Sequence, residues 1–177
     1  DQILGGNGVA PNLDGFYNSA SNFDVSASGK FYHAIESANE FDVLVAAINQ
    51  LQIANYRPDY ILLNPTDFHK ILLLKDTTNN YLKDQVYQGL QPNFLGVPIA
   101  VNNEVNAGTF LVGNFGQAAQ LWVRDNVAVE FFTEDGTNVR DGFVTVRVQE
   151  RVALATYLPN GILDGTFSTA KAALETA

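Results

Sequence analysis

Apolar positions follow two different periods along this chain, and the period changes near residue 97. Between Asn39 and Asn55, apolar residues recur at spacings of three and four, which predicts an amphipathic helix that stops near Asn55. Asn39 is a suitable N-cap, and Asp42, three residues later, makes a variant of the capping box. The short apolar run 60–63 predicts a strand, and an Asn-Pro pair then predicts a second helix over 64–76.

From residue 97 onward the apolar runs are short and are separated by Asn, Gly and Asp, which predicts a series of strands. The Arg-Asp-Asn sequence at 124–126 predicts a hairpin turn between two of them. The last run, 143–158, alternates: one face carries Val144, Val146, Val148, Val152, Leu154 and Leu158, and the other carries Thr145, Arg147, Gln149 and Arg151. At ~3.3 Å per residue this strand would span about 50 Å, too long for a compact domain. We therefore predict an α+β fold in an elongated molecule that lies beside neighbours.

Composition limits the classes of function. Of 177 residues, 46% are hydrophobic and 16% are charged, which is typical of a globular protein. No apolar run approaches the ~18 residues of a membrane span, and there is no signal peptide. Ten Lys and Arg stand against nineteen Asp and Glu, so sequence-specific nucleic-acid binding is not expected. Cysteine is absent, which removes thiolate chemistry. Methionine is also absent and the chain opens on Asp1, so we expect a fragment or a processed form.

Two motifs that suggest chemistry are better explained by architecture. Asp67 and His69 stand two apart on a predicted helix, so their side chains point roughly 160° apart and cannot share a substrate. We expect Asp67 to support the helix N-terminus and His69 to be a surface or packed residue. The glycine-rich sequence 5–8 lacks the features of a phosphate-binding loop and is predicted to be a structural turn. Residues 1–30 are expected to be loop with short strands, and 77–96 a hairpin or extended loop.

Glu150 is a charged residue on the apolar face of the long predicted strand. A buried carboxylate needs a partner, so we expect an ion pair with Arg124, Arg140 or an arginine of a neighbouring subunit rather than a general base. Together with Arg147 and Arg151, Glu150 is a candidate for ion pairs, within or between subunits, that fix subunit register.

Other candidate residues give weaker evidence of a functional site. Glu130, Glu134 and Asp135 could attract a divalent cation, but their spacing is that of solvated acids. Trp122, among apolar neighbours, is expected in the core. Nothing assembles a nucleophile, a base and an oxyanion hole, so we expect neither an enzyme nor a cofactor or metal.

Four segments occur in a familiar order: LGGNGVAPNLDGF (4–16), ILLNPTDFHKILLLKDTTNNYL (61–82), LGVPIAVNNEVNAGTFLVGNFGQAAQLWVRDNVAVEFF (95–132) and VTVRVQERVALATYLPNGILDGTF (144–167). Together they resemble the major capsid protein family of tailed double-stranded-DNA bacteriophages. The resemblance implies that family's fold, in which an axial lobe clusters around five-fold and six-fold axes and a peripheral lobe contains a long β-strand. We expect residues 1–34 to be the glycine loop and the start of the peripheral lobe, 35–140 the axial lobe, and 141–177 the long strand and C-terminal tail. The family's N-terminal arm, extended loop and spine helix are absent from this sequence, so we expect that the chain by itself can remain monomeric.

One departure from the family bears on chemistry. Some members join neighbouring subunits by a Lys–Asn isopeptide bond that a glutamate assists. Here Gly142 stands at the asparagine position and Gln149 at the glutamate position, so this cross-link is not expected. Asn80 and the Asn160-Gly161 pair are lesser departures that affect loop geometry.

The resemblance implies a structural function: non-covalent self-assembly into pentamers and hexamers of an icosahedral shell that encloses DNA. The expected location is the virion, assembled in the bacterial cytoplasm, and scaffold, protease and portal proteins are candidate partners. One alternative is the shell of a bacterial nanocompartment with the same fold. An alternative of another class is a small monomeric ligand-binding domain, whose candidate aromatic site would be Tyr81, Tyr87 and Phe94.

Overall fold

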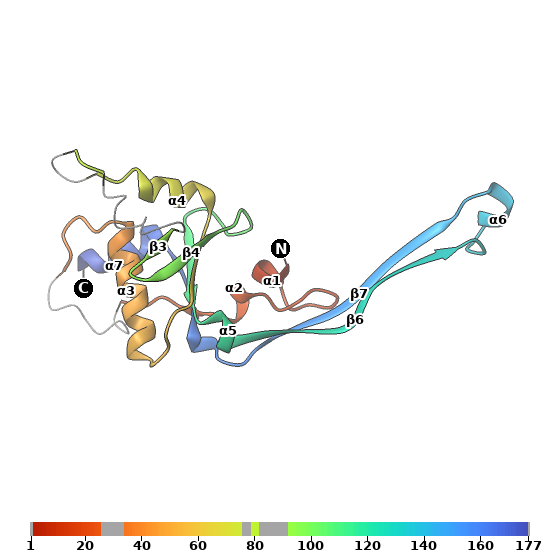
Figure 1. Ribbon diagram of the computed structural model, residues 1–177, viewed down its shortest axis with the longest axis horizontal. Helices are drawn as coiled ribbons and strands as arrows, with labels where there is room; N and C mark the ends of the chain where they lie inside the picture. The colour runs from red at the N-terminus through yellow and green to blue at the C-terminus, as the bar shows by residue number, and fades with distance from the viewer. Residues whose placement is uncertain (1, 26–33, 76–78, 82–91, 177) are drawn as a thin grey trace.

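The computed structural model describes residues 2–25, 34–75, 79–81 and 92–176. These residues form a body around one sheet, from which a long two-stranded hairpin extends (Figure 1). The body combines helices with a mixed, mainly antiparallel sheet, which confirms the predicted α+β class, and the projecting hairpin makes the molecule elongated, as predicted. Within the described residues, no helix is long and apolar enough to cross a membrane.

Six strands form the sheet of the body. Their order is β1 (Ser21–Asn22), β8 (Ile162–Thr166), β5 (Thr109–Gly113), β2 (Tyr60–Leu63), β4 (Val97–Val101) and β3 (Asn93–Phe94). The pairs β1–β8 and β2–β4 run parallel, and the other neighbours run antiparallel. The alternation of strand side chains sends Phe110 and Val112 to one core and Leu111 to another on the opposite face.

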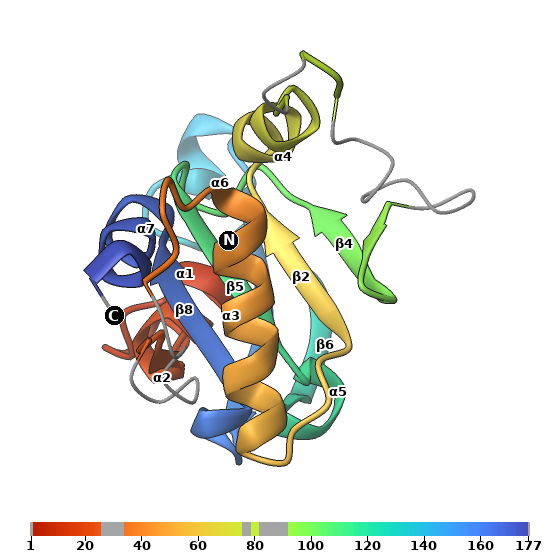
Figure 2. The same ribbon diagram turned by 90° about the vertical axis from the view of Figure 1, so that its left-hand side faces the viewer.

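The larger core lies under two helices, α3 (Glu40–Ile53) and α7 (Phe167–Thr176), which stand in front of the sheet in Figure 2. Lys171 of α7 donates to Glu40 of α3 at 2.8 Å, so an ion pair joins the two helices. The smaller core, on the other face, receives Leu4 and Phe16 from the N-terminal segment. The sheet of the body is therefore covered on both faces.

The start of α3 confirms the predicted capping box. Asn39 Oδ1 accepts hydrogen bonds from the backbone N–H groups of Phe41 (2.9 Å) and Asp42 (3.2 Å), and the Asp42 carboxylate accepts the N–H of Asn39 (2.9 Å). Both halves of the motif thus satisfy donors that lack a partner within the helix. The helix ends at Ile53, and Asn55, in the left-handed region at φ 63°, follows where the end was predicted.

The glycine-rich N-terminal segment is a structural turn, as predicted. Gly6 and Gly15 lie so close to other backbone that a Cβ on Gly6 would stand 2.2 Å from the carbonyl oxygen of Leu13. The prediction of loop with short strands for residues 1–30 missed two helices, α1 (Gln2–Gly5) and α2 (Phe16–Ser19). Each is a single turn, too short to show helical periodicity in the sequence.

The hairpin consists of β6 (Ala119–Phe132) and β7 (Thr145–Thr156), with α5 (Phe115–Ala118) at the body and α6 (Asn138–Asp141) at the tip (Figure 1). The predicted turn at 124–126 is wrong. β6 continues through these residues and shifts register on both sides of Asp125, so a bulge accommodates the polar sequence without reversing the chain. β7 is also shorter than the predicted 143–158: residues 157 and 158 lead into a short 3₁₀ turn (Pro159–Gly161).

Candidate assembly surface

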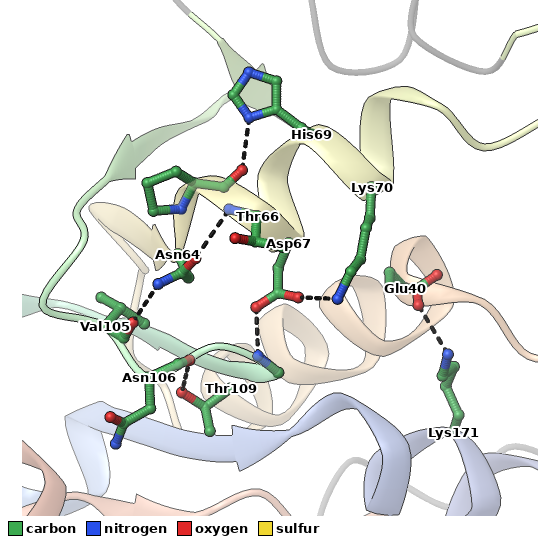
Figure 3. Close-up of polar contacts among 12 residues, drawn as sticks. Glu40, Asn64, Thr66, Asp67, His69, Lys70, Val105, Asn106, Thr109 and Lys171 are labelled. Atoms are coloured by element: carbon green, nitrogen blue, oxygen red, sulfur yellow. Dashed lines mark hydrogen bonds and ion pairs between the residues drawn. The ribbon is translucent and has the colours of Figure 1, made fainter.

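The sequence motif around Asp67 is structural (Figure 3). The second helix, α4 (Pro65–Leu72), is shorter than the predicted 64–76. Its N-cap, Asn64, accepts the N–H of Thr66 at 2.9 Å and donates its side-chain amide to the carbonyl of Val105 at 2.7 Å. One side chain therefore caps the helix and ties it to the loop before β5.

Asp67 makes the second tie to that loop. The residue is 3% exposed, and its carboxylate accepts the backbone N–H of Gly108 and lies 3.0 Å from the Nζ of Lys70. His69 is exposed, and its Nδ1 lies 2.6 Å from the carbonyl oxygen of Pro65 (Figure 3). The two side chains do not meet, so the structure confirms the architectural interpretation of this pair.

The hairpin carries an exposed apolar face. Strand pairing places four pairs of apolar residues on the same side of the ribbon: Leu121 with Leu154, Val123 with Val152, Val129 with Val148, and Phe131 with Val146. We call these eight residues the apolar face. Phe131 is 68% exposed and Val148 is 63% exposed, whereas the half-buried Leu154 contacts the smaller core of the body. The face therefore begins at the body and continues outward with no cover from the described residues.

This exposure has an energetic consequence. A two-stranded ribbon is marginally stable in water by itself, and a monomeric soluble protein rarely exposes a continuous apolar surface of this kind. The apolar face is about 30 Å long, since it spans nine residues of β7 at ~3.3 Å each. Such a surface is typical of a protein–protein contact.

The opposite face of the hairpin mixes polar residues with apolar ones such as Trp122 and Phe132, and it holds two ion pairs. Arg147 donates two hydrogen bonds to Glu130, one from Nε at 3.1 Å, and Arg151 lies 3.5 Å from Asp125. Both pairs join β6 to β7, and each of the four side chains is about half exposed, between 43% and 60%. Their contribution to stability is therefore small, although they favour the observed strand register. A role for either arginine in contacts between subunits stays a prediction.

Glu150 lies at the middle of the ribbon. Alternation along β7 places it on the apolar face, between Val148 and Val152. Its side chain is exposed, and it makes no ion pair with Arg124, Arg140 or any other described residue. The expected partner within the chain is therefore missing from the described residues, and a partner from another subunit stays a prediction.

The prediction that Trp122 belongs to the core is wrong. Trp122 is 53% exposed on the hairpin, and its indole N–H donates to the hydroxyl of Tyr157 at 3.0 Å. Its apolar sequence neighbours lie on the same projecting ribbon, outside the body, so they cannot bury the indole ring.

The proposed aromatic binding site does not form among the described residues. Phe94 is buried in the core and packs on Phe41 at a ring-centroid distance of 5.6 Å. Tyr81 is exposed beneath the Nζ of Lys75, and Tyr87 lies outside the described residues. The 77–96 prediction likewise falls mostly on residues outside the described ranges.

The acidic residues near the hairpin tip are engaged or solvated. Glu130 binds Arg147, and the carboxylate of Asp135 accepts the hydroxyl of Thr145 at 3.2 Å. In the described part of the chain, no three His, Cys, Asp or Glu side chains cluster as metal ligands would. At the tip, Gly142 follows α6 in the left-handed region at φ 69°, a conformation that favours glycine.

Comparison with known proteins identifies a family that has this sequence and fold. The sequence model of the phage capsid family matches residues 1–167. The major capsid protein of Enterobacteria phage HK97 is 35% identical over 169 residues, which are 95% of this chain and 42% of that protein. The chain thus spans about two fifths of the length of this curated relative.

Solved structures show the same fold at lower identity. The capsid of an empty GTA particle matches with a TM-score of 0.71 and 18% identity, over 93% of this chain and 59% of that one. The structure of Mycobacterium phage Bobi matches with a TM-score of 0.60 and 19% identity, over 94% and 59% of the two chains. The predicted capsid fold is confirmed. This chain belongs to the phage capsid family.

Proposed function

We propose that this chain is the core of a major capsid subunit of a tailed phage or prophage, which assembles non-covalently into the pentamers and hexamers of a DNA-enclosing shell. The apolar face of the hairpin is the observation that carries the proposal. A surface of this length needs a cover, and repeated subunits provide one by symmetry. Many weak contacts of this kind, each repeated around the shell, give a stable closed particle.

The two parts of the molecule suit two roles. The body, with its sheet covered on both sides, suits the lobe that gathers around five-fold and six-fold axes, and the hairpin suits the peripheral lobe. The hairpin joins β6, from the range 35–140, to β7, from the range 141–177, while β8 and α7 return to the body. We therefore propose that the peripheral lobe contains residues 119–156 together with the glycine loop.

Charge supports a container for DNA. The net charge of −9 repels a polyanion, so packaged DNA would not adhere to the body of the subunit. This function implies a place in the virion after assembly in the bacterial cytoplasm, with scaffold, protease and portal proteins as further partners. The 35% identity to a phage capsid protein favours this proposal over a nanocompartment shell.

Assembly without covalent bonds is supported by two residues. Gly142 at the hairpin tip has no side-chain amide, and Gln149, exposed on β7, is not a base. The residues present on this chain therefore lack the groups that an isopeptide bond would need at these positions.

Electron microscopy with light scattering tests the proposal. The polypeptide that carries this sequence in its host is expressed alone and compared with a Phe131→Ser/Val148→Ser variant, which makes two exposed residues of the apolar face polar. A Thr133→Ser/Thr145→Ser variant is the matched hairpin control. We expect closed shells or rings of five and six for the parent and the control, and loss of particles for the first variant, with unchanged circular dichroism. A uniform monomer at high concentration with scaffold supplied, or normal particles from the first variant, would contradict the proposal.

A further inference from the structure

A cleft of about 910 Å³ lies at the end of the body where β2 and β4 begin. One side of α3, the residues directly before β2 and the turn at 95–96 before β4 form its walls. Ile48 and Val97 contribute buried apolar surface to the lining. Gln52 and Asn55 bring exposed side-chain amides, which both donate and accept hydrogen bonds. The cleft can therefore satisfy the polar backbone of an inserted loop and also cover its apolar atoms.

Arg57 is the charge that this cleft offers to an occupant. It is exposed and forms no ion pair with any described residue. Asp59, the other charged residue of the lining, is already engaged, because its carboxylate accepts the N–H groups of Phe115 at 2.9 Å and Gly116 at 2.8 Å. The lysines of the body that the structure describes also have partners: Lys70, Lys75 and Lys171. In a chain of net charge −9, the cleft therefore presents an uncommitted positive charge and fits an acidic occupant.

The loop of residues 102–108 lies at the opposite end of the same strands. β2 and β4 run parallel, so both begin at the cleft and end towards this loop, and Figure 2 shows β2 pointing from α5 towards α4. Asn64 and Asp67 bind the loop from the start of α4. From α2, the hydroxyl of Tyr17 accepts the backbone N–H of Asn106 at 3.0 Å. Surface loops are usually mobile, whereas these ties restrain this one and reduce the entropy that it would lose on binding.

Glu104 gives this loop its charge. It is exposed, and its carboxylate forms no ion pair with any described residue. Its backbone N–H donates to Asn102 Oδ1 at 3.0 Å, an Asx-turn that restrains the backbone at this point. The five residues of β4 separate the loop from the cleft by about 15 Å, at ~3.3 Å each, so Glu104 cannot reach Arg57 of its own chain. The loop thus presents a carboxylate whose complement lies at the far end of the body.

We propose that the loop 102–108 of one copy enters the cleft of the next copy, where Glu104 pairs with Arg57 of the partner subunit. Because the loop and the cleft are different surfaces, the contact is heterologous, and its repetition around an axis closes a ring. This inference rests on the proposed function, because it names a contact that holds the bodies together in pentamers and hexamers. An exposed ion pair adds little affinity, so the two charges chiefly orient the contact, and the rest of the covered loop supplies most of the attraction.

Cross-linking of assembled particles tests which surfaces meet. Cysteine is absent from this sequence, so introduced thiols report on chosen positions. Particles of the Arg57→Cys/Glu104→Cys variant, treated with a short bismaleimide, should give a ladder of up to five and six copies on a denaturing gel. Particles co-assembled from the two single variants should give dimers only, and each single variant alone should stay monomeric. The control Arg57→Cys/Glu134→Cys, whose second thiol lies towards the hairpin tip, should give no ladder.

Charge reversal tests the ion pair itself. Arg57→Glu or Glu104→Arg should lower the yield of particles roughly tenfold, and the Arg57→Glu/Glu104→Arg double variant should restore it. The control Glu134→Arg changes the net charge from −9 to −7, just as Glu104→Arg does, and should leave the yield unchanged. Circular dichroism establishes that each variant is folded.

The outcomes separate this inference from the proposed function. Particles of the Arg57→Cys/Glu104→Cys variant without a ladder would show that other surfaces meet, and the proposed function would stand. Dimers from either single variant alone would show a two-fold contact in place of the head-to-tail one. A double charge variant as weak as the singles would remove the ion pair from the contact. A parent polypeptide that forms no particles, with scaffold supplied, would overturn both the proposed function and this inference.

Discussion

Removal of the Asp67 carboxylate should destabilise the body more than loss of its visible salt bridge would suggest. Asp67 is almost completely buried and accepts the N–H of Gly108, whereas Lys70, its ionic partner, is 61% exposed. A hydrogen bond to a charged group contributes about 1.5–3 kcal/mol, and its loss leaves a donor without a partner. The exposed i,i+3 ion pair contributes only about 0.2–0.5 kcal/mol.

These magnitudes predict an order among three substitutions. Asp67→Ala removes both interactions and should lower the free energy of unfolding by about 2–3.5 kcal/mol. Asp67→Asn keeps an acceptor for Gly108 and loses mainly the charge near the helix N-terminus, which predicts a loss of about 1 kcal/mol. Lys70→Ala loses the ion pair alone and should stay near 0.5 kcal/mol or less.

Urea unfolding followed by far-ultraviolet circular dichroism at pH 7 measures all three values, and an unchanged m-value shows that only stability has altered. Equal losses for Asp67→Asn and Asp67→Ala would mean that charge, and not the acceptor, matters. A Lys70→Ala loss as large as that of Asp67→Ala would show that the salt bridge holds the corner. Either result would refute the reasoning from burial.

Three further predictions follow from local geometry. Gly15→Ala should lower the melting temperature in a thermal scan far more than Gly96→Ala. A Cβ on Gly15 would stand 2.5 Å from a backbone atom, whereas a Cβ on Gly96 would enter open space and meet only the strain of a positive φ of 79°. Similar changes in melting temperature for the two variants would contradict this prediction. Burial raises the pKa of Asp164, whose Oδ1 has no hydrogen-bond partner, so the wild type loses stability as pH rises above the carboxyl's usual range. Asp164→Asn should therefore stabilise the chain at pH 7, by at most ~1 kcal/mol, and stabilise it less at pH 4; a pH-independent difference in urea unfolding would refute this. Because of Gly142 and Gln149, boiled particles should run as a single monomer band on a denaturing gel, and a ladder of higher masses would disprove it.

Local signals predicted the parts of the body that local chemistry determines. The capping box at Asn39 and Asp42 formed because its atoms lie within one helical turn, independent of tertiary contacts. The Asn-Pro start of the second helix succeeded for the same reason. The second role of Asn64, as donor to Val105, could not be predicted, because its partner lies 41 residues away along the chain.

Signals that depend on tertiary context failed in the hairpin. The polar residues at 124–126 are compatible with either a turn or a bulge, because both features have almost the same residue composition. Only the pairing with the partner strand decides between them. The prediction that Trp122 is buried was wrong for a similar reason, because apolar neighbours indicate burial only if the strand lies within the body. One-turn helices such as α1 and α2 carry no period, so their absence from the prediction is unavoidable.

The long alternating strand shows what such a pattern can predict. Alternation over 143–158 indicates that one face of the strand is covered, but it does not indicate by what. In the body, strands β5 and β2 receive their cover from α3 and from the N-terminal segment, whereas the outer apolar face of β6 and β7 receives none from the described residues. A place where local pattern and the chain's own packing disagree is where function is expected. The ion pairs on the opposite face strengthen this argument. Arg147 and Arg151 each pair with a carboxylate across the ribbon, while Glu150, on the apolar face, pairs with no described residue. The apolar face is therefore the side of the hairpin on which a contact with another polypeptide is expected.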